Sequence, residues 1–208
     1  MREPLYLQYG CGWCAPEGWL NFDASPTLWF ERLPVVGRLV RKNAERFPDN
    51  VQFGDIVRGL AVPPGSCAGV YCSHVLEHLA LDDFHLALRN TKELLTVGGR
   101  FRLVLPDLEY YTKRYVEDVT PAAAHVFMRE SGLGEERRPR GPKGWLIAGL
   151  GNSRHRWMWD FASMKSALED AGFREIRRAQ FGDSEDHRFN QVEQKDRWDN
   201  SLGVECIK

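Results

Sequence analysis

Two glycines and an aspartate near the N-terminus are spaced to bind a nucleoside. An apolar run at residues 5–9 predicts a buried parallel strand, and Gly10 and Gly12 follow it directly. Glycines at this spacing let the backbone turn sharply and approach a ligand without an intervening Cβ. A second apolar run ends at Asp23, where a carboxylate could accept two hydrogen bonds from ribose hydroxyls. We therefore expect a nucleoside site at these residues.

The spacing argues against a dinucleotide as the ligand. The third glycine of the dinucleotide-binding pattern would fall at Ala15, and no amphipathic helix separates Gly12 from Asp23. A pyrophosphate is normally bound at the N-terminus of such a helix. A nucleoside without phosphates fits better, and a tight turn without any ligand is the alternative.

A second group of residues could bind a metal. His74, Glu77 and His78 match the His-x-x-Glu-His pattern of one class of zinc peptidases, in which the glutamate is the base. That pattern belongs inside a longer helix, with both histidines on one face. Here it directly follows an apolar strand, so we expect Glu77 and His78 to be structural, bonding the backbone at the start of the next helix. A zinc metallopeptidase is kept as a remote alternative.

A cysteine pair raises a further possibility of redox or zinc chemistry. Cys11 and Cys14 form a C-x-x-C pattern. A redox pair would open a helix after a strand, and a zinc knuckle would need a second pair. Cys67 and Cys72 have the wrong spacing for that second pair, so we expect neither chemistry.

Length and composition describe one globular domain. The chain has 208 residues, 43% of them hydrophobic, and a formal net charge of -1. This charge gives no field that would favour nucleic acid or an anionic membrane. No apolar run could span a bilayer, the N-terminus does not resemble a signal peptide, and the five cysteines fit reduced thiols. We expect a cytoplasmic protein without nucleic-acid or membrane partners; its oligomeric state is not determined by the sequence.

Strands and helices alternate along the first half of the chain. After the two N-terminal strands, apolar runs predict further strands at residues 50–55, 68–73 and 100–105. Helices are predicted at residues 35–42 and 82–95, the second stopped by Gly98 and Gly99.

The alternation stops between residues 107 and 160. Helices are predicted at residues 108–117 and 120–131, the second with Thr120 as N-cap, followed by a Gly/Pro/Arg-rich loop at residues 132–144. A helix at residues 161–171, closed by Gly172, and two strands at 175–180 and 203–207 complete the chain. We expect these last two strands to pair antiparallel at the sheet edge.

Five segments in series resemble the class I S-adenosylmethionine-dependent methyltransferases, and most of all a small type-11-like group. They are LQYGCG, GWLNFDAS, FGDI, YCSHVLEHL and LLTVGGRFRLVLPDLE, within about residues 5–109. The resemblance implies one α/β domain over residues 1–208 with a Rossmann-like, mostly parallel sheet of seven strands and helices on both faces. The implied strand order is 3-2-1-4-5-7-6, with strand 7 antiparallel. It also implies S-adenosylmethionine as the cofactor.

The family pattern assigns roles to matching residues. It places Gly10 and Gly12 beside the methionine part of the cofactor, Asp23 on the ribose, and Asp55 with the backbone of Ile56 at the adenine. Many members carry an acid where this chain has Gln8, and a third glycine where it has Cys14. The implied cofactor-binding residues are Gln8, Gly10, Gly12, Asp23, Asp55, Ile56, Ser73 and His74.

A methyl sulfonium is already activated, so the protein mainly has to align the acceptor in line with it. No metal is expected. A base helps only if the acceptor is a hydroxyl or a protonated amine, and the candidates are His74, His78, His155 and Asp107. His155 could equally be a packed histidine.

The insertion at residues 107–160 is expected to form the acceptor side, with Tyr110, His155 or Trp157 near the methyl position. We expect methyl transfer to a small-molecule or sugar-like acceptor. A catalytically inactive nucleoside-binding module of the same fold is the alternative, because Gln8 and Cys14 depart from the pattern.

Overall fold

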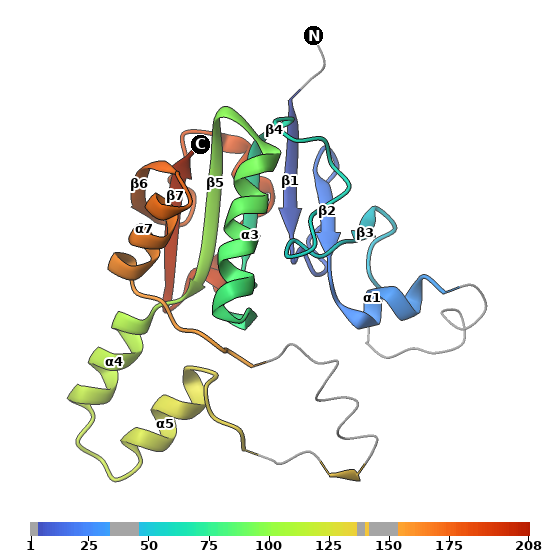
Figure 1. Cartoon of the computed structure of the whole chain (residues 1–208). Coiled ribbons are helices and arrows are strands. Elements are labelled where there is room, and N and C mark those ends of the chain that lie inside the picture. Colours follow the sequence, from blue (N-terminus) through green and yellow to red (C-terminus); the bar gives the residue numbers. More distant parts are fainter. Residues whose placement is uncertain (1–3, 34–45, 137–139, 142–153) are drawn as a thin grey trace.

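The computed structural model describes residues 4–33, 46–136, 140–141 and 154–208, which form a seven-stranded sheet in the order β3-β2-β1-β4-β5-β7-β6 (Figure 1). The first five strands pair in parallel, and β7 runs antiparallel to both β5 and β6. The predicted fold class, strand order and antiparallel last pair are therefore confirmed. The strands are β1 (Leu5–Tyr9), β2 (Leu20–Asp23), β3 (Val51–Phe53), β4 (Cys67–Ser73), β5 (Leu95–Pro106), β6 (Arg174–Ala179) and β7 (Ser201–Ile207).

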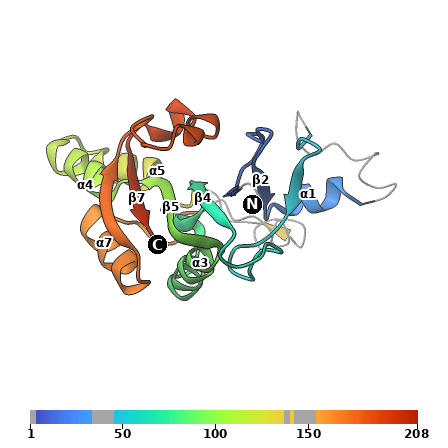
Figure 2. The same ribbon diagram turned by 90° about the horizontal axis from the view of Figure 1, so that it is seen from above.

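Helical segments surround this sheet. Figure 2 shows α3 and α7 on one face, and the chain between β6 and β7 on the other. In Figure 1, α4 and α5 lie beyond the edge at which the parallel strands end. The helices are α1 (Pro26–Glu31), α3 (Leu81–Leu94), α4 (Leu108–Glu117), α5 (Ala123–Glu130) and α7 (Phe161–Asp170), with 3-10 helices η1 (Leu76–His78), η2 (His187–Gln191) and η3 (Lys195–Trp198).

Both faces of the sheet are buried, which explains why its central strands are almost continuously apolar. Successive side chains of a strand point to opposite faces, so Tyr6 and Leu7 enter different cores. Leu7 belongs to the larger core beneath α3 and α7. Tyr6 belongs to a smaller aromatic core that Phe189 of η2 completes. The larger core includes Leu7, Val70, Phe101, Phe84, Leu88, Met164 and Leu168, and the smaller one Tyr6, Trp19, Tyr71, Val104, Phe189 and Val192.

Several predicted boundaries were wrong. Gly98 and Gly99 do not end α3, because β5 starts directly after Leu94. The ladder pairs Cys67 with Leu95 and then Gly69 with Arg100, so the glycines form a bulge inside the strand, with Gly98 at φ 78°. Helix α5 begins two residues later than predicted, with Ala122 rather than Thr120 at the N-cap.

Other predictions fall wholly or partly outside the described residues. The helix predicted at residues 35–42 and Trp145 lie outside them. Of the predicted loop at residues 132–144, only 132–136 and 140–141 are described.

A buried arginine lies at the centre of the second face. Arg102 of β5 has no exposed surface, and its guanidinium binds Glu193, Asp183 (3.0 Å), Glu205 (3.1 Å) and the carbonyl of Gln180 (2.6 Å). The guanidinium also lies 4.7 Å from the ring centroid of Trp198. A buried charge is costly unless it is paired, so this polar side of β5 requires the acids of the β6–β7 connection.

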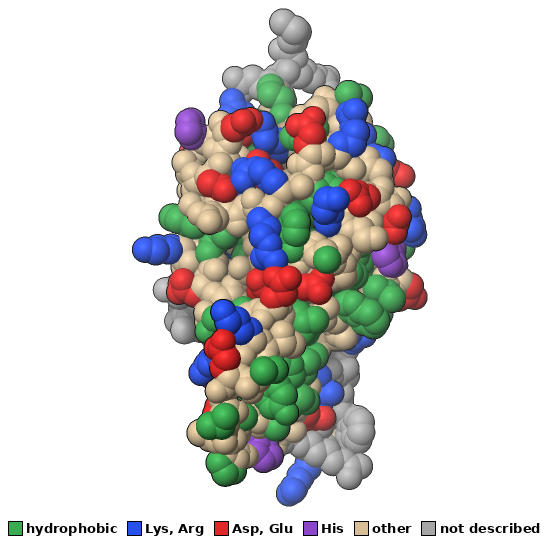
Figure 3. Space-filling view, turned by 90° about the vertical axis from the view of Figure 1, so that its left-hand side faces the viewer, with side chains coloured by type: hydrophobic (Ala, Val, Ile, Leu, Met, Phe, Trp, Pro, Cys, Tyr) green, Lys and Arg blue, Asp and Glu red, His purple; other side chains and the backbone are tan. Residues whose placement is uncertain are grey.

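The outer surface beside these elements has two parts. In Figure 3, Lys, Arg, Asp and Glu side chains are interspersed over the upper part of the molecule, which includes β6 and α7. Apolar side chains gather lower down, on the side of α4 and α5 (Figure 3). Tyr115, Val116, Val119 and Met128 are exposed in that region.

We expect Arg102→Met to lower the free energy of unfolding by about 3–5 kcal/mol, because it leaves buried carboxylates without a partner. Urea unfolding followed by circular dichroism measures this. Arg114→Met removes an exposed ion pair with Glu130 and should cost at most about 1 kcal/mol. Equal effects of the two substitutions would contradict the structural role given to Arg102.

Candidate functional site

A cleft of about 400 Å³ lies at the edge of the sheet where the parallel strands end. Ligands of open α/β sheets bind in this position, where the strand order reverses between β1 and β4. The loops that follow β1, β2, β3 and β4 all reach it. Its lining consists of Tyr9, Gly10, Ala24, Gly54, Asp55, Ile56, Val57, Arg58, Val75, His78, Leu79, Ala80, Asp83 and Arg156.

The glycine turn after β1 forms one wall of this cleft. Gly10 has φ 67° and Gly12 has φ 54°, a left-handed conformation that favours glycine. A Cβ on Gly10 would also lie only 2.1 Å from Cγ2 of Val75, whereas a Cβ on Gly12 would meet nothing within 4 Å. Gly10 therefore lets two loops pack closely, and Gly12 leaves open space.

The structure joins the glycine turn to the predicted carboxylate. Asp23, at the end of β2, is 8% exposed. Its Oδ2 accepts a hydrogen bond from the Gly12 N–H (3.0 Å), and its Oδ1 accepts one from the Ser25 N–H (2.7 Å). Each carboxylate oxygen can accept a second hydrogen bond, so Asp23 is held in place with acceptor capacity to spare.

The loop after β3 forms the opposite wall. The Asp55 carboxylate accepts a hydrogen bond from the Val57 N–H (2.9 Å), and Ile56 is buried. Asn90 of α3 donates to the carbonyls of Ile56 (2.7 Å) and Val57 (3.0 Å), which fixes the loop against the helix. Asp55 and Ile56 therefore line the cleft on a rigid support that the sequence pattern did not reveal, and their contact with an adenine stays a prediction.

Two predicted cofactor-binding residues have partners within the fold. Gln8 is 2% exposed and donates to the carbonyl of Cys14 and to Oδ1 of Asn21, both at 2.7 Å. Arg197 donates to the Oγ of Ser73 (3.0 Å) and to its carbonyl (2.9 Å). Of the eight predicted cofactor-binding residues, Gly10, Asp55 and Ile56 line the cleft, whereas Gln8, Gly12, Asp23, Ser73 and His74 do not. Their direct contact with a cofactor stays a prediction.

Asp107, a candidate base, caps a helix. Its Oδ1 accepts from the Glu109 N–H (2.9 Å) at the start of α4, and its Oδ2 lies 3.5 Å from Nη1 of Arg178. It does not line the cleft. The neighbouring Leu108 N–H donates to the carbonyl of Trp159 (2.9 Å), which links the start of α4 to the end of the segment 154–159.

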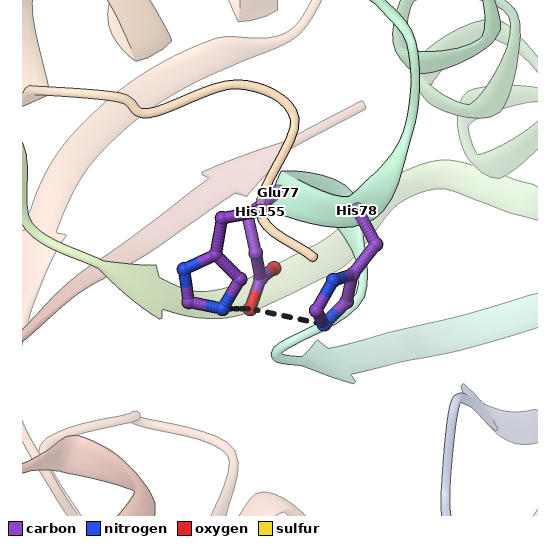
Figure 4. Close-up of side chains that lie close together, drawn as sticks. All are labelled: Glu77, His78 and His155. Carbon is purple, nitrogen blue, oxygen red and sulfur yellow. Dashed lines mark ion pairs between the residues drawn. The ribbon is translucent and has the colours of Figure 1, made fainter. Parts of the chain in front are cut away.

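The other candidate bases gather around a buried glutamate. Oε1 of Glu77 lies 3.3 Å from Nδ1 of His74, 3.8 Å from Nε2 of His78 and 3.9 Å from Nε2 of His155. Figure 4 shows the rings of His78 and His155 flanking the Glu77 carboxylate. The backbone contributes too, because the carbonyl of Glu77 accepts from the N–H groups of Arg156 (2.7 Å) and Trp157 (3.2 Å). This cluster brings together the insertion and the loop after β4.

The contacts predicted for Glu77 and His78 differ from those observed. The ring of His78 bonds the carbonyl of Arg154, not the start of α3. Neither oxygen of the fully buried Glu77 carboxylate has a hydrogen-bond partner among the described residues. The peptidase geometry is also missing, because His74 has φ 53° and η1 spans three residues, so the two histidines share no helix face. Nothing in the sequence indicated that this motif lies beside His155, because the two are far apart along the chain.

The cysteine pair lacks reactive character. Burial, together with the nearby Asp23 carboxylate, raises the pKa of Cys11 to about 12, and burial also raises the pKa of Cys14. Both are free thiols. A redox pair needs a lowered pKa, so this geometry agrees with the expectation that the pair is not redox-active.

Comparison with known proteins identifies the fold. No protein-family model matches the chain, and no curated protein matches it. The chain is similar to an S-adenosylmethionine-dependent methyltransferase from Thermotoga maritima, at 13% identity and a TM-score of 0.55, over 100% of this chain and 84% of the other.

Two further solved structures have a similar fold. A Haloferax volcanii protein solved with the Trm112 methyltransferase activator gives 15% identity and a TM-score of 0.51, over 98% and 82% of the two chains. The chain is also similar to the YcgJ protein of Bacillus subtilis, at 14% identity and a TM-score of 0.51, over 99% of this chain and 92% of the other. The fold is therefore that of the class I methyltransferases. Within the described residues, no helix combines the length and apolar character needed to cross a membrane.

We expect Cys11 to resist alkylation by iodoacetamide in the folded protein at pH 8. With a pKa of about 12, only about one thiol in 10,000 is then a thiolate, against about a quarter for an ordinary cysteine. The rate at which Cys11 is alkylated should keep rising as the pH is raised well above 8.5. Peptide mass spectrometry measures this, with urea-unfolded protein as the control. Rapid labelling of native Cys11, or a disulfide with Cys14, would restore the redox interpretation.

Proposed function

We propose that the protein is an S-adenosylmethionine-dependent methyltransferase that acts on a small-molecule or sugar-like acceptor by in-line attack. One observation carries this proposal. In a class I methyltransferase fold, the cleft at the carboxyl ends of the strands lies between the Gly10 turn, fixed to Asp23, and the loop of Asp55 and Ile56. These are the elements that a nucleoside ligand requires.

The residues present fit the cofactor. Asp23 is positioned by two backbone N–H groups and keeps free acceptor sites for two ribose hydroxyls. Asp55 and the apolar surfaces of Ile56 and Leu79 suit an adenine ring. The volume of about 400 Å³ lies in the range of small-molecule sites. Gly10, where the methionine part is expected, lines the cleft and has no Cβ to obstruct a ligand.

The bound cofactor supplies a methyl group on a positively charged sulfur, ready for attack by a nucleophile. The protein then has to orient the acceptor and exclude water. The segment 154–159 is suited to this task, because Arg156 lines the cleft and Trp157 is bonded to η1 through its backbone. We propose that residues 107–160 form the acceptor side, with Tyr110 and Trp157, both partly exposed, available for stacking.

Of the four candidate bases, His78 is the one that reaches the cleft. The rings of His155 and His74 each bond a backbone carbonyl, of Ser131 (2.6 Å) and Arg197 (2.8 Å), and direct their other nitrogen toward Glu77. His78 lines the cleft itself. If the acceptor is a hydroxyl, His78 is the better placed of the three to meet it.

A binding module without catalysis is the second candidate. Gln8 gives both of its amide hydrogens to the fold, where many family members have an acid beside the cofactor. Such a protein would bind the cofactor or its demethylated product without turnover. Assays of binding and of turnover therefore separate the two functions.

Asp23→Ala should weaken binding of S-adenosylhomocysteine by about 1.5–3 kcal/mol, because it removes hydrogen bonds to a charged group. Isothermal titration calorimetry measures the change, with circular dichroism to confirm the fold. Asp49→Ala removes a fully exposed acid and should leave binding unchanged. An unaltered dissociation constant for a folded Asp23→Ala protein would exclude Asp23 from the site.

Turnover is tested by incubating the wild-type protein with methyl-labelled cofactor and a panel of hydroxylated small molecules and sugars. We expect labelled product and S-adenosylhomocysteine to form. Chromatography with scintillation counting detects both. The Asp23→Ala protein should lose this turnover at cofactor concentrations near the wild-type dissociation constant. Tight cofactor binding with no turnover over the whole panel would favour the inactive module.

A further inference from the structure

We propose that Glu77, His78 and His155 bind a first-row divalent transition metal at the end of the cleft. Their ligand atoms all lie within 4.8 Å of one another. Oε1 of Glu77 is 3.8 Å and 3.9 Å from the two Nε2 atoms (Figure 4). Ligands bound tetrahedrally at about 2.0–2.1 Å lie about 3.4 Å apart, so the two glutamate–histidine pairs have to close by about half an ångström, and the two Nε2 atoms, which lie within 4.8 Å of each other, by at most about 1.4 Å.

The hydrogen bonds of the rings direct free nitrogens toward the site. Nδ1 of His78 lies 2.9 Å from the carbonyl of Arg154, and Nδ1 of His155 lies 2.6 Å from the carbonyl of Ser131. A carbonyl oxygen only accepts, so each Nδ1 carries a hydrogen, and a metal would be bound through the inward Nε2 lone pair of each ring. Metal-binding histidines are held in this way by an outer hydrogen bond to a carbonyl. His74 shows the same arrangement, with Nε2 on the carbonyl of Arg197 and Nδ1 toward Glu77.

The buried carboxylate requires a positive partner. Glu77 has no exposed surface, and no donor within the described residues bonds either of its oxygens. A carboxylate in this position is costly, and lone pairs of neighbouring neutral rings add repulsion. One cation between Oε1 and the two Nε2 atoms would satisfy all three groups at once. The competing arrangement is an imidazolium facing the carboxylate, which needs no metal.

The choice of metal follows from the ligands. Two imidazoles and one carboxylate suit zinc, iron, manganese, cobalt or nickel, whereas magnesium and calcium prefer oxygen ligands alone. Three protein ligands also leave a coordination position open. This reverses the expectation, drawn from the sequence, that no metal is involved.

The site is open to the cleft. The His78 side chain is 18% exposed and lines the cleft, and that of His155 is 17% exposed. An ion here could therefore bind an oxygen of a second ligand and make a hydroxyl more acidic, and His78, with its Nε2 on the metal, would then be a ligand and not the base. Resting on the proposed function, this identifies the acceptor class as small molecules whose reactive oxygen can bind a metal.

The test uses tag-free protein that has been stripped of metal with a chelator and dialysed. Metal binding is measured by calorimetric titration with ZnCl2 and by the visible absorption of added CoCl2. We expect one equivalent of either metal per chain and no comparable binding of MgCl2. His78→Gln and Glu77→Gln should each weaken zinc binding at least tenfold. His187→Gln is the matched control, since it changes an exposed histidine of η2 outside the cluster, and it should bind like the wild type.

Thermal unfolding keeps the test valid if Glu77→Gln is unstable. Zinc should raise the melting temperature of the wild type and of His187→Gln, but not of His78→Gln or His155→Gln, whose altered side chains are partly exposed. No stoichiometric zinc on the wild type, or undiminished binding by folded His78→Gln and His155→Gln, would overturn the proposal in favour of an imidazolium–carboxylate cluster.

Methyl transfer is measured separately, with and without added zinc. Stoichiometric metal without turnover supports the site and counts against the proposed function. Full turnover by a protein that binds no metal supports the function and overturns the site. The two failures are therefore distinguishable.

Discussion

The close packing of the turn after β1 against the loop after β4 determines where the rest of the site lies. Gly10 has no side chain, and a Cβ in its place would lie 2.1 Å from Cγ2 of Val75. The loop after β4 can therefore lie against the end of β1, and η1 follows at once. This places Val75 and His78 in one cleft with Gly10. It also exposes the carbonyl of Glu77 to the segment 154–157, which binds it through two backbone N–H groups.

The protein contains two buried charged groups in opposite situations. Arg102 is matched by three carboxylates and a carbonyl, so its burial stabilises one arrangement of β5, β7 and the connection between β6 and β7. Glu77 is equally buried, but its described neighbours are ring nitrogens whose partner nitrogens already bond carbonyls. A buried charge that is fully paired, like Arg102, stabilises the fold. A buried carboxylate without donors, at the edge of a cleft, points to a ligand.

The departures from the family pattern are connected through the second face of the sheet. The connection between β1 and β2 contains no described helix to cover this face, and Trp19 at its end packs into the core there. Phe189 of η2 covers it instead, packing against Tyr6 and Trp19 at ring-centroid distances of 6.4 Å and 5.8 Å. Gln8 is buried near the shortened connection and binds its backbone at Cys14. The unusual residue at position 8 is thus explained by the fold, whatever its effect on a cofactor. The shared fold alone does not decide the chemistry, which depends on the side chains of the site.

The sequence by itself indicated the individual strands, the glycine turn and the strand-end acids, because each depends on local signals, whereas the sheet order followed from the resemblance of five segments to a known family. Apolar runs, glycines and strand-end acids lie within a few residues of one another, so Gly10, Asp23 and Asp55 were placed correctly at the strand ends. Only the tertiary structure decided which polar residues meet across long separations. Glu77 and His155 are brought together by the packing of the insertion on η1, and Arg102 meets Glu193 through the cover of the second face. No periodicity or spacing encodes such contacts, because they arise from how separate elements pack and how buried charges find partners.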